Sequence, residues 1–575
     1  MPTFSEYIRD CSPGAMKLEK PVLSKEDMPS LRRFCEVYRA MEYPLLKASQ
    51  YMAFARRGDR AAWEKPWFLR RRKLIAALMD ALYFGGDTDA VIDGLWLICE
   101  ESTWVISAHN GAEHAGVEPT PPKPLPEGQP YVDLFAAQTA MILSLTCALL
   151  PALPEVVRHR AYHEIEVRVL IPFETRDDFW WIGIIRKDLC NWTPWIVSNV
   201  MLSACVLIED KTRLSALLSR ACAMLDRYVD SLPDDGGCDE GPGYWSMAGG
   251  ALLDCLELLE RVTNNEMALW KNEKLKNILR FPMRMWLGGE WFANFADCDA
   301  KPDIPGERLQ CAGEKLNDPA LTAFGAHFRG DPTKLVEDTP QLWRLLNALS
   351  RPRMNAGEAQ TPEDVWLPNL EVRIVSRGGV ALACKGGVNE GSHNHNDCGG
   401  FMVCIDGMPQ IIDAGNMTYT GKTFSDARYT LWNIRSRYHS VPQIGEYEQV
   451  NGWERRARAV ECAPDGLAMD IAPAYPNEAG VLTCRRELHC DGWGVTMRDA
   501  VVTQTPQTLT EVFMLRRRDG VTITPSIPME SEIEEIPIDD PRMAKNYPGS
   551  LWRLAFTVPA ALSHDLTFRI ERKAS

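Results

Sequence analysis

The spacing of apolar residues changes near residue 350, and this change constrains the fold more than any other feature of the sequence. Before it, apolar residues recur at the three- and four-residue spacing of an amphipathic helix. After it, short runs alternate with the two-residue period of a strand. A chain of 575 residues is also too long for one ordinary domain. We therefore expect a helical domain followed by a β domain.

Helix-spaced segments fill the first part of the chain, which we assign to one domain, residues 1–355. The predicted helices cover residues 71–84, 89–102, 133–150, 155–173, 194–209, 213–232 and 248–263. Each has a broad apolar face, and the loops between them are rich in Pro, Gly, Asp and Asn. Many paired helices without a short exact repeat favour an (α/α) array or toroid over a four-helix bundle or a regular solenoid.

Short alternating runs follow a Pro-rich polar stretch, residues 351–369. Runs such as "EVRIVS", "GVALACKG" and "GWGVTMRDAVVT" predict strands. Asp406-Gly407 stands between two of these runs and predicts a tight β-hairpin. Many strands separated by turns imply an antiparallel β-sandwich, which we assign to residues 366–575.

The charge and the cysteines narrow the classes of partner and compartment. A formal charge of −15 argues against a nucleic-acid partner or an anionic membrane surface, although a local basic cluster can still bind an anionic substrate. Seventeen scattered cysteines without a CxxC pair indicate buried free thiols and a reducing compartment. No signal-peptide pattern opens the sequence, so we expect a cytoplasmic protein, or a periplasmic or secreted one if its native signal is missing. The sequence leaves a homo-oligomer open.

Asn191 opens the first of three polar sites that stand against apolar surroundings. It precedes a predicted helix in "CNWTPWIVSN", where the ordinary interpretation is a helix start with Asn191 or Thr193 near the cap and Pro194 early in the first turn. Four tryptophans lie nearby: Trp180, Trp181, Trp192 and Trp195. They are either core residues or platforms on which sugar rings stack.

Tyr244 closes the second site, the acidic and Gly-rich stretch "PDDGGCDEGPGYW". The ordinary interpretation is an interhelical loop with a packed aromatic residue. The functional one is that Gly241 and Gly243 let the backbone place Tyr244 at the rim of a cavity. There its hydroxyl could exchange a proton with a substrate if its pKa were tuned by a neighbouring cation.

The third site is "GSHNHNDCGG", residues 391–400, together with the segment that follows it. His395, Asp413 and His439 make a plausible His/Asp/His set for zinc, and the predicted hairpin would return Asp413 to His395. In a strand, His393 and His395 would share a face, and both would point to the metal. In a Gly- and Asn-rich turn they would diverge, and the spacing alone leaves both options open.

Five stretches of this sequence, in this order, resemble the heparinase II/III-like polysaccharide lyases and their alginate-lyase relatives. They are "NWTPWIVSNVML", "DGGCDEGPGYW", "NFADCDAKPDIPG", "SHNHNDCGGFMVCIDGMPQIIDAGNMTY" and "RYHSVPQIG". The resemblance implies an incomplete (α/α) toroid followed by an antiparallel β-sandwich, with the active site in the cleft between them. It also implies cleavage of glycans that contain uronic acid by β-elimination, which leaves an unsaturated uronate end.

The resemblance assigns catalytic roles by position. Asn191 resembles the group that neutralises the uronate carboxylate, Tyr244 the catalytic tyrosine, acting as base, acid or both, and His393 the catalytic histidine. Tyr429 falls where some alginate-lyase relatives carry a second catalytic tyrosine, although its spacing to His439 departs from their pattern.

Metal and substrate contacts follow from the same resemblance. His395, Asp413 and His439 resemble the ligands of one divalent metal, usually zinc, with a mainly structural role. The candidate contacts to an anionic glycan are Trp192, Trp245, Arg435 and Arg437. The two arginines are equally compatible with ordinary surface positions.

We favour a lyase that acts on glycosaminoglycans, with an alginate or oligoalginate lyase of the same architecture as the alternative. A hydrolase on an (α/α) toroid would need a carboxylate pair such as Asp239 and Glu240, but adjacent residues rarely flank one bond. A glycan-binding protein without activity is the third option. Product analysis separates the three, because a lyase alone creates a conjugated double bond.

Overall fold

The computed structural model describes residues 3–109, 120–121, 130–265, 267–337, 339–354, 361–391 and 393–573. The chain forms two compact units. The first comprises Met1–Leu232, Ser246–Leu279 and Pro305–Gly357, and the second comprises Pro233–Trp245, Arg280–Ile304 and Glu358–Ser575. The second unit therefore includes two segments that the sequence assigns to the helical domain.

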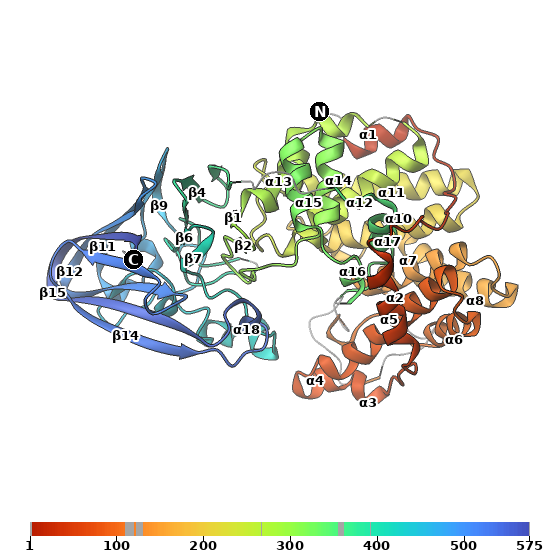
Figure 1. The fold of residues 1–575 in the computed structure, drawn as a ribbon, viewed down its shortest axis with the longest axis horizontal. Coiled ribbons are helices and arrows are strands. Elements are labelled where there is room, and N and C mark those ends of the chain that lie inside the picture. The colour runs from red at the N-terminus through yellow and green to blue at the C-terminus, as the bar shows by residue number, and fades with distance from the viewer. Residues whose placement is uncertain are drawn as a thin grey trace. The chain divides into compact units, whose positions relative to one another are not determined.

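The first unit is helical (Figure 1). Its helices are α1 (Phe4–Arg9), α2 (Met28–Arg39), α3 (Ala48–Tyr51), α4 (Ala53–Arg57), α5 (Ala61–Tyr83), α6 (Thr88–Cys99), α7 (Leu134–Leu149), α8 (Glu155–Ile165), α9 (Ile171–Thr175), α10 (Trp192–Leu207), α11 (Lys211–Ser231), α12 (Gly249–Thr263), α14 (Gly306–Leu316), α15 (Pro319–Phe328), α16 (Lys334–Glu337) and α17 (Leu342–Ser350). α13 (Glu273–Arg284) runs from the first unit into the second. All seven predicted helical segments are confirmed as helical.

Local chemistry explains where several of these helices begin and end. Asp133 caps α7, since its side chain accepts hydrogen bonds from the backbone of Phe135 and Ala136. The segment predicted as one helix over 155–173 is divided by a π-helical turn, Glu166–Leu170. Pro172 follows that turn and lacks the N–H that a regular helix interior requires.

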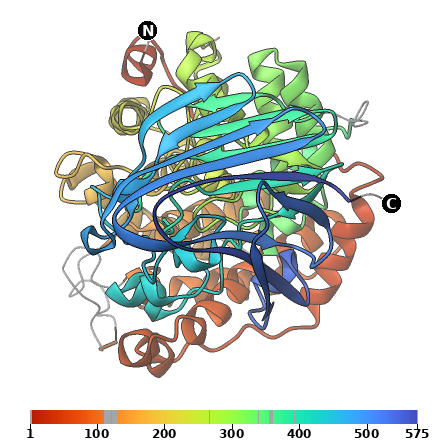
Figure 2. The ribbon, with the colours of Figure 1, turned by 90° about the vertical axis from the view of Figure 1, so that its left-hand side faces the viewer.

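The second unit is built on antiparallel strands (Figure 2). They are β1 (Trp286–Gly288), β2 (Trp291–Phe292), β3 (Val365–Leu367), β4 (Val372–Arg377), β5 (Val380–Lys385), β6 (Phe401–Ile405), β7 (Met408–Ile411), β8 (Gln443–Ile444), β9 (Arg458–Ala463), β10 (Gly466–Asp470), β11 (Val481–Cys490), β12 (Gly494–Leu515), β13 (Val521–Pro525), β14 (Glu530–Pro537) and β15 (Ser550–Arg572), with the short helix α18 (Met543–Asn546) before β15. The main sheet has the order β3-β4-β5-β6-β7-β12-β11-β10-β9, and β15 pairs with β12, β13 and β14.

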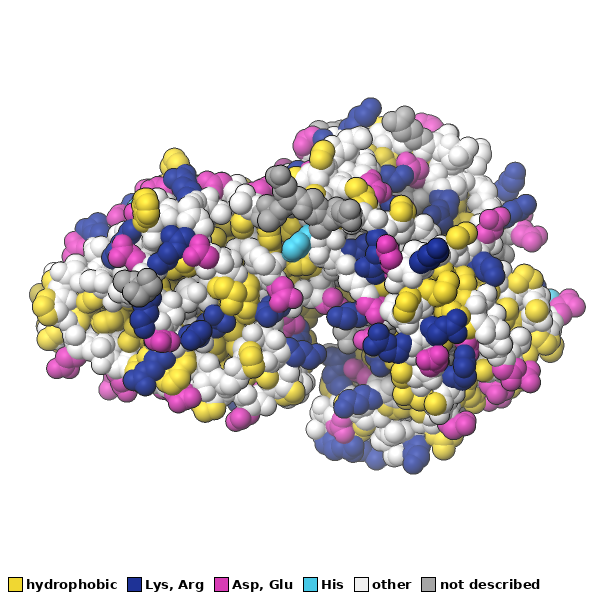
Figure 3. All heavy atoms as spheres, in the orientation of Figure 1, with side chains coloured by type: hydrophobic (Ala, Val, Ile, Leu, Met, Phe, Trp, Pro, Cys, Tyr) yellow, Lys and Arg dark blue, Asp and Glu magenta, His cyan; other side chains and the backbone are white. Residues whose placement is uncertain are grey.

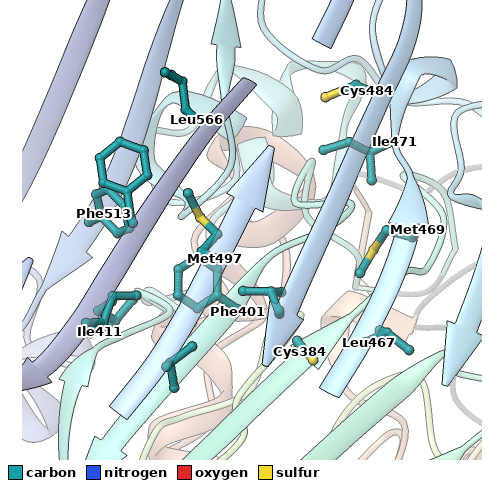
Figure 4. Close-up of a cluster of buried hydrophobic side chains, with 14 of the residues drawn as sticks. Cys384, Phe401, Ile411, Leu467, Met469, Ile471, Cys484, Met497, Phe513 and Leu566 are labelled. Atoms are coloured by element: carbon teal, nitrogen blue, oxygen red, sulfur yellow. The ribbon is translucent and has the colours of Figure 1, made fainter. Parts of the chain in front are cut away.

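The core of the second unit lies between the apolar faces of these strands (Figure 4). Phe401 of β6 packs edge-on against Phe513 of β12, with ring centroids 6.2 Å apart. Leu467 and Met497 bring β10 and β12 into the same cluster. The register of β12 against β15 shifts between Val502 and Gln507. The predicted class, helices followed by an antiparallel β-sandwich, is confirmed.

The hairpin at Asp406-Gly407 is confirmed and connects β6 to β7. Asp406 has φ 50° and Gly407 has φ 72°, the left-handed conformations that a two-residue hairpin turn needs at both positions. β7 ends at Ile411, shortly before Asp413. The hairpin thus leads directly to Asp413, which lies beside His395 and His439.

All seventeen cysteines are free thiols, as their scatter predicts. Among the described residues, no helix has both the length and the apolar character that crossing a bilayer requires.

Candidate functional site

Residues 294–298 form the base of the candidate site in the second unit. The buried amide of Asn294 donates to the backbone oxygens of Cys298 and Asp413, at 3.4 and 3.3 Å. A Cβ on Gly415 would lie 2.4 Å from the Cys298 oxygen, and a Cβ on Gly241 would lie 2.9 Å from the Cys298 Cβ. Only glycine permits either approach. These contacts are the physical reason why residues 233–245 and 280–304 belong to this unit.

Tyr244 lies at the start of a 3₁₀ turn, Tyr244–Met247. Its hydroxyl is 2.7 Å from that of Tyr419, and its ring centroid is 5.1 Å from that of His393. Burial, together with the Tyr419 hydroxyl, raises the pKa of Tyr244, so the group is a neutral phenol at ordinary pH. Burial and the nearby Asp297 carboxylate raise the pKa of Tyr419 to about 12.

His393 lies beside both tyrosines in a left-handed backbone conformation, with φ 58°. Its Nδ1 is 2.9 Å from Asp297 Oδ2 and 3.3 Å from the Tyr419 hydroxyl. Its Nε2 is 3.7 Å from Glu240 Oε1. With Nδ1 donating to the Asp297 carboxylate, Nε2 carries the lone pair and can accept a proton.

Two buried carboxylates beside His393 have opposite pKa shifts. Burial raises the pKa of Glu240 to about 7, against the favourable charge of His393. Burial alone would also raise the pKa of Asp297, but hydrogen bonds from His393 and His395 hold it well below its usual range. Asp297 is therefore a permanent anion, whereas Glu240 changes its charge near neutral pH.

The structure brings His395, Asp413 and His439 together. All three are buried, and one ligand atom from each lies within 4.8 Å of the others. His395 Nε2 donates to Asp297 at 3.1 Å, and its buried Nδ1 has no hydrogen-bond partner. His439 Nε2 donates to the Asn433 backbone oxygen at 3.0 Å, and its Nδ1 lies 3.1 Å from Asp413 Oδ2. Each histidine thus turns one nitrogen inward and ties the other to an outer partner, an arrangement that fits a zinc site.

The two histidines of "GSHNHNDCGG", His393 and His395, diverge. His395 is fully buried beside Asp413 and His439. The His393 side chain is 19% exposed and lies beside Tyr244 and Tyr419. Residues 393–400 form turns and irregular backbone and not a strand, so the period-two argument for a shared face does not apply. Of the two options that the sequence leaves open, the structure has the turn.

Tyr419, rather than Tyr429, is the tyrosine that the structure brings to Tyr244. The Tyr429 hydroxyl donates instead to Asn394 Oδ1, at 2.9 Å. Tyr429 lies in a 3₁₀ turn, Asp426–Thr430.

Asn191 and Trp192 belong to the first unit. Asn191, one of the two residues expected near the cap, occupies the cap position of α10, yet its side chain makes no capping hydrogen bond. The Trp192 ring lies 5.1 Å from Trp180 and 4.7 Å from His109. Of the four neighbouring tryptophans, Trp181 and Trp195 are buried core residues, and Trp180 and Trp192 are half-buried. Only the latter pair is compatible with sugar stacking.

Three predicted substrate contacts have other partners in the second unit. Trp245 is only 1% exposed, so its ring face is covered, and the prediction that it stacks on sugar is wrong. Arg435 forms an ion pair with Glu448. Arg437 lies 3.8 Å from Glu534.

Sequence reasoning assigned no role to several residues of this site: Asp297, Tyr419, Arg428 and Arg542. Asp297 stands within "NFADCDAKPDIPG" and Tyr419 within the stretch that carries Asp413, so their place in the resembling stretches was the available signal. Arg428 reaches Asp297 Oδ2 at 2.9 Å. The Arg542 guanidinium lies 5.2 Å from the Tyr419 ring centroid, and it pairs with Asp299. Nothing in the local sequence indicates these long-range contacts.

Comparison with known proteins gives a family for the C-terminal region. The family model for the C-terminal domain of heparinase II/III-like proteins matches residues 359–527. No curated protein matches the chain in sequence.

Several solved structures share the fold along nearly the whole chain. A heparinase III with methylated lysines has a TM-score of 0.62 and 12% identity, with 100% of this chain and 88% of that chain covered. Another heparinase III has a TM-score of 0.60 and 11% identity, with 96% and 93% covered. A heparan sulfate lyase from Pedobacter heparinus has a TM-score of 0.58 and 14% identity, with 99% and 88% covered. The chain therefore has the fold of these structures, and residues 359–527 match the C-terminal domain of heparinase II/III-like proteins.

Proposed function

We propose that this protein is a glycosaminoglycan lyase that cleaves its substrate by β-elimination. The observation that carries the proposal is the pairing of Tyr244 with His393, whose rings lie 5.1 Å apart in one unit. Burial keeps the Tyr244 hydroxyl protonated, as a neutral phenol. The hydrogen bond from His393 Nδ1 to Asp297 leaves the lone pair of that ring on Nε2. One group can give a proton where the other takes one.

The chemistry of β-elimination requires such a pair. The proton at C5 of a uronate leaves with difficulty because the attached carboxylate is already negative. In our assignment, Nε2 of His393 removes that proton, and the electron pair forms the C4–C5 double bond. The C4–O4 bond breaks, and the Tyr244 hydroxyl gives its proton to the departing O4. Tyr419 holds the Tyr244 hydroxyl in place through the 2.7 Å hydrogen bond.

Two further groups complete the proposal. We propose that His395, Asp413 and His439 hold a divalent metal, zinc by donor set, which when bound supplies a fixed positive charge that orders the turn behind His393. Asn191, in the helical unit, stays our prediction for the group that neutralises the uronate carboxylate. Its amide is not used in capping α10, which supports that role.

A glycosaminoglycan is the favoured substrate because the solved structures reported above act, by their names, on heparin or heparan sulfate. An alginate would meet the same chemistry and is the alternative. The acidic net charge does not prevent binding of an anionic glycan, since Lys and Arg side chains gather locally over α3 to α5 (Figure 3). Incubation with a panel of uronate polymers, followed at the ultraviolet absorbance of unsaturated ends, tests both the reaction and the substrate.

A further inference from the structure

Asp297 stands between His393 and His395, the two histidines of residues 391–400. Its Oδ2 accepts a hydrogen bond from His393 Nδ1 at 2.9 Å, and its Oδ1 accepts one from His395 Nε2 at 3.1 Å. Its side chain is 1% exposed. One carboxylate therefore contacts both the candidate catalytic histidine and a candidate metal ligand.

Other contacts fix this carboxylate in place. Arg428 Nη2 lies 2.9 Å from Oδ2. The Asp297 backbone N–H donates to the His393 oxygen at 3.0 Å, and its backbone oxygen accepts from the Asn416 amide at 3.1 Å. Held at side chain and backbone, Asp297 has little freedom to move toward one histidine without affecting the other.

We propose that Asp297 is a positioning residue that couples the metal site to His393. By accepting from His395 Nε2, it leaves Nδ1 of that ring as the free donor atom for the metal. By accepting from His393 Nδ1, it leaves Nε2 of that ring as the atom that faces Glu240. The same carboxylate thus selects both tautomers. A metal on His395 strengthens the hydrogen bond from His395 Nε2–H to Asp297. It thereby changes the strength of the hydrogen bond that the same carboxylate accepts from His393 Nδ1.

The part that concerns catalysis rests on the proposed function, while the coupling itself does not. A matched control separates coupling from the general cost of losing a buried carboxylate. Asp499 is fully buried in the same unit and pairs with Arg486 at 2.5 Å. Like Asp297 it accepts hydrogen bonds from an arginine, but its bonds to Arg486 do not involve His393, His395, Asp413 or His439.

The first experiment measures zinc affinity by competition with a chelator, using the full-length protein. We expect Asp297→Asn to weaken zinc binding about 10- to 100-fold, the usual effect of losing such an outer hydrogen bond. Asp499→Asn should bind zinc as the wild type does. Unchanged zinc affinity in Asp297→Asn would overturn the proposal, as would an equal loss in Asp499→Asn.

The second experiment measures the chemical reactivity of His393 itself and does not depend on catalytic turnover. Its rate of modification by diethyl pyrocarbonate is read by peptide mass spectrometry, with and without zinc, since the side chain is partly exposed. In the wild type, zinc should change this rate, and in Asp297→Asn the response should disappear. If Asp297→Asn does not fold, the wild-type measurement still decides: a rate that ignores zinc refutes the coupling. Failure of the lyase proposal would appear separately, as missing product with both readouts intact.

Discussion

The hydroxyl oxygens of Tyr244 and Tyr419 lie 2.7 Å apart, although 175 residues separate them in sequence. Tyr244 follows the Gly-rich stretch 233–245, and Tyr419 follows the hairpin that delivers Asp413. Their hydrogen bond joins two segments that the sequence places in different domains. It also identifies Tyr419 as the second tyrosine that contacts Tyr244, the candidate proton donor.

Removal of the Tyr244 hydroxyl tests that donor. We expect Tyr244→Phe to lower kcat by roughly 100-fold or more with little change in KM, because a proton-transfer group is lost and the ring remains. Initial rates across substrate concentrations separate the two constants. Near-normal turnover would remove Tyr244 from the mechanism.

The two candidate second tyrosines give a matched pair of variants. Tyr419→Phe should lower kcat about fivefold to tenfold, the effect of one lost hydrogen bond on the donor. Tyr429→Phe should stay close to wild type, since its hydroxyl bonds to Asn394. The opposite order would return the role to Tyr429.

Loss of one metal ligand should lower metal content and stability together. We expect His395→Ala to lose its zinc, and its thermal midpoint should no longer rise when zinc is added. The buried Asp297 carboxylate also loses a hydrogen-bond partner, at a cost of about 1–3 kcal/mol. His489→Ala, on the partly exposed surface of the same unit, is the control. Full metal content in His395→Ala would refute the ligand assignment.

The raised pKa of Glu240 predicts a pH-dependent stability. Its pKa is about 7 in the folded protein and 4.5 as the ordinary value, so the folded state holds the extra proton between these limits. The unfolded chain binds fewer protons there, and stability falls as pH rises from 4.5 to 7. Glu240→Gln removes this loss, so relative to wild type its unfolding midpoint should be higher at pH 8 than at pH 5. Glu454→Gln, whose side chain is 70% exposed, should show no such change. A pH-independent difference for Glu240→Gln would contradict the assignment.

Asn191 provides a test in which activity and stability separate. Asn191→Ala should cost little stability, because the side chain makes no capping hydrogen bond. If it neutralises the substrate carboxylate, kcat/KM should fall by about 100-fold or more. Asp210→Ala removes a real cap, the bond to the Arg213 backbone, and should cost about 1 kcal/mol without loss of turnover. Equal activity in Asn191→Ala and wild type would exclude the role.

The spacing of apolar residues is sufficient to predict the fold class, because it shows directly which side of each helix or strand is buried. The helices and the Asp406-Gly407 hairpin follow from patterns within a few residues. The unit boundaries do not, since residues 233–245 and 280–304 join the second unit through close approaches at Gly241 and Gly415. Such approaches depend on residues far along the chain.

The candidate site was predictable where the ligand types are distinctive. His395, Asp413 and His439 meet as their chemistry suggests. Asp297 and Tyr419 were missed because a lone aspartate or tyrosine carries no local signal. Trp245 was assigned wrongly because a tryptophan next to a functional residue is as often core as surface.

The central claim is that this protein is a lyase, and the products test it most directly. Heparan sulfate, chondroitin sulfate, hyaluronan and alginate would each be digested in ¹⁸O-labelled water and analysed by ultraviolet absorbance and mass spectrometry. We predict ultraviolet-absorbing unsaturated ends without incorporated ¹⁸O, from a glycosaminoglycan in preference to alginate. Saturated ends that carry ¹⁸O would show hydrolysis and contradict the account.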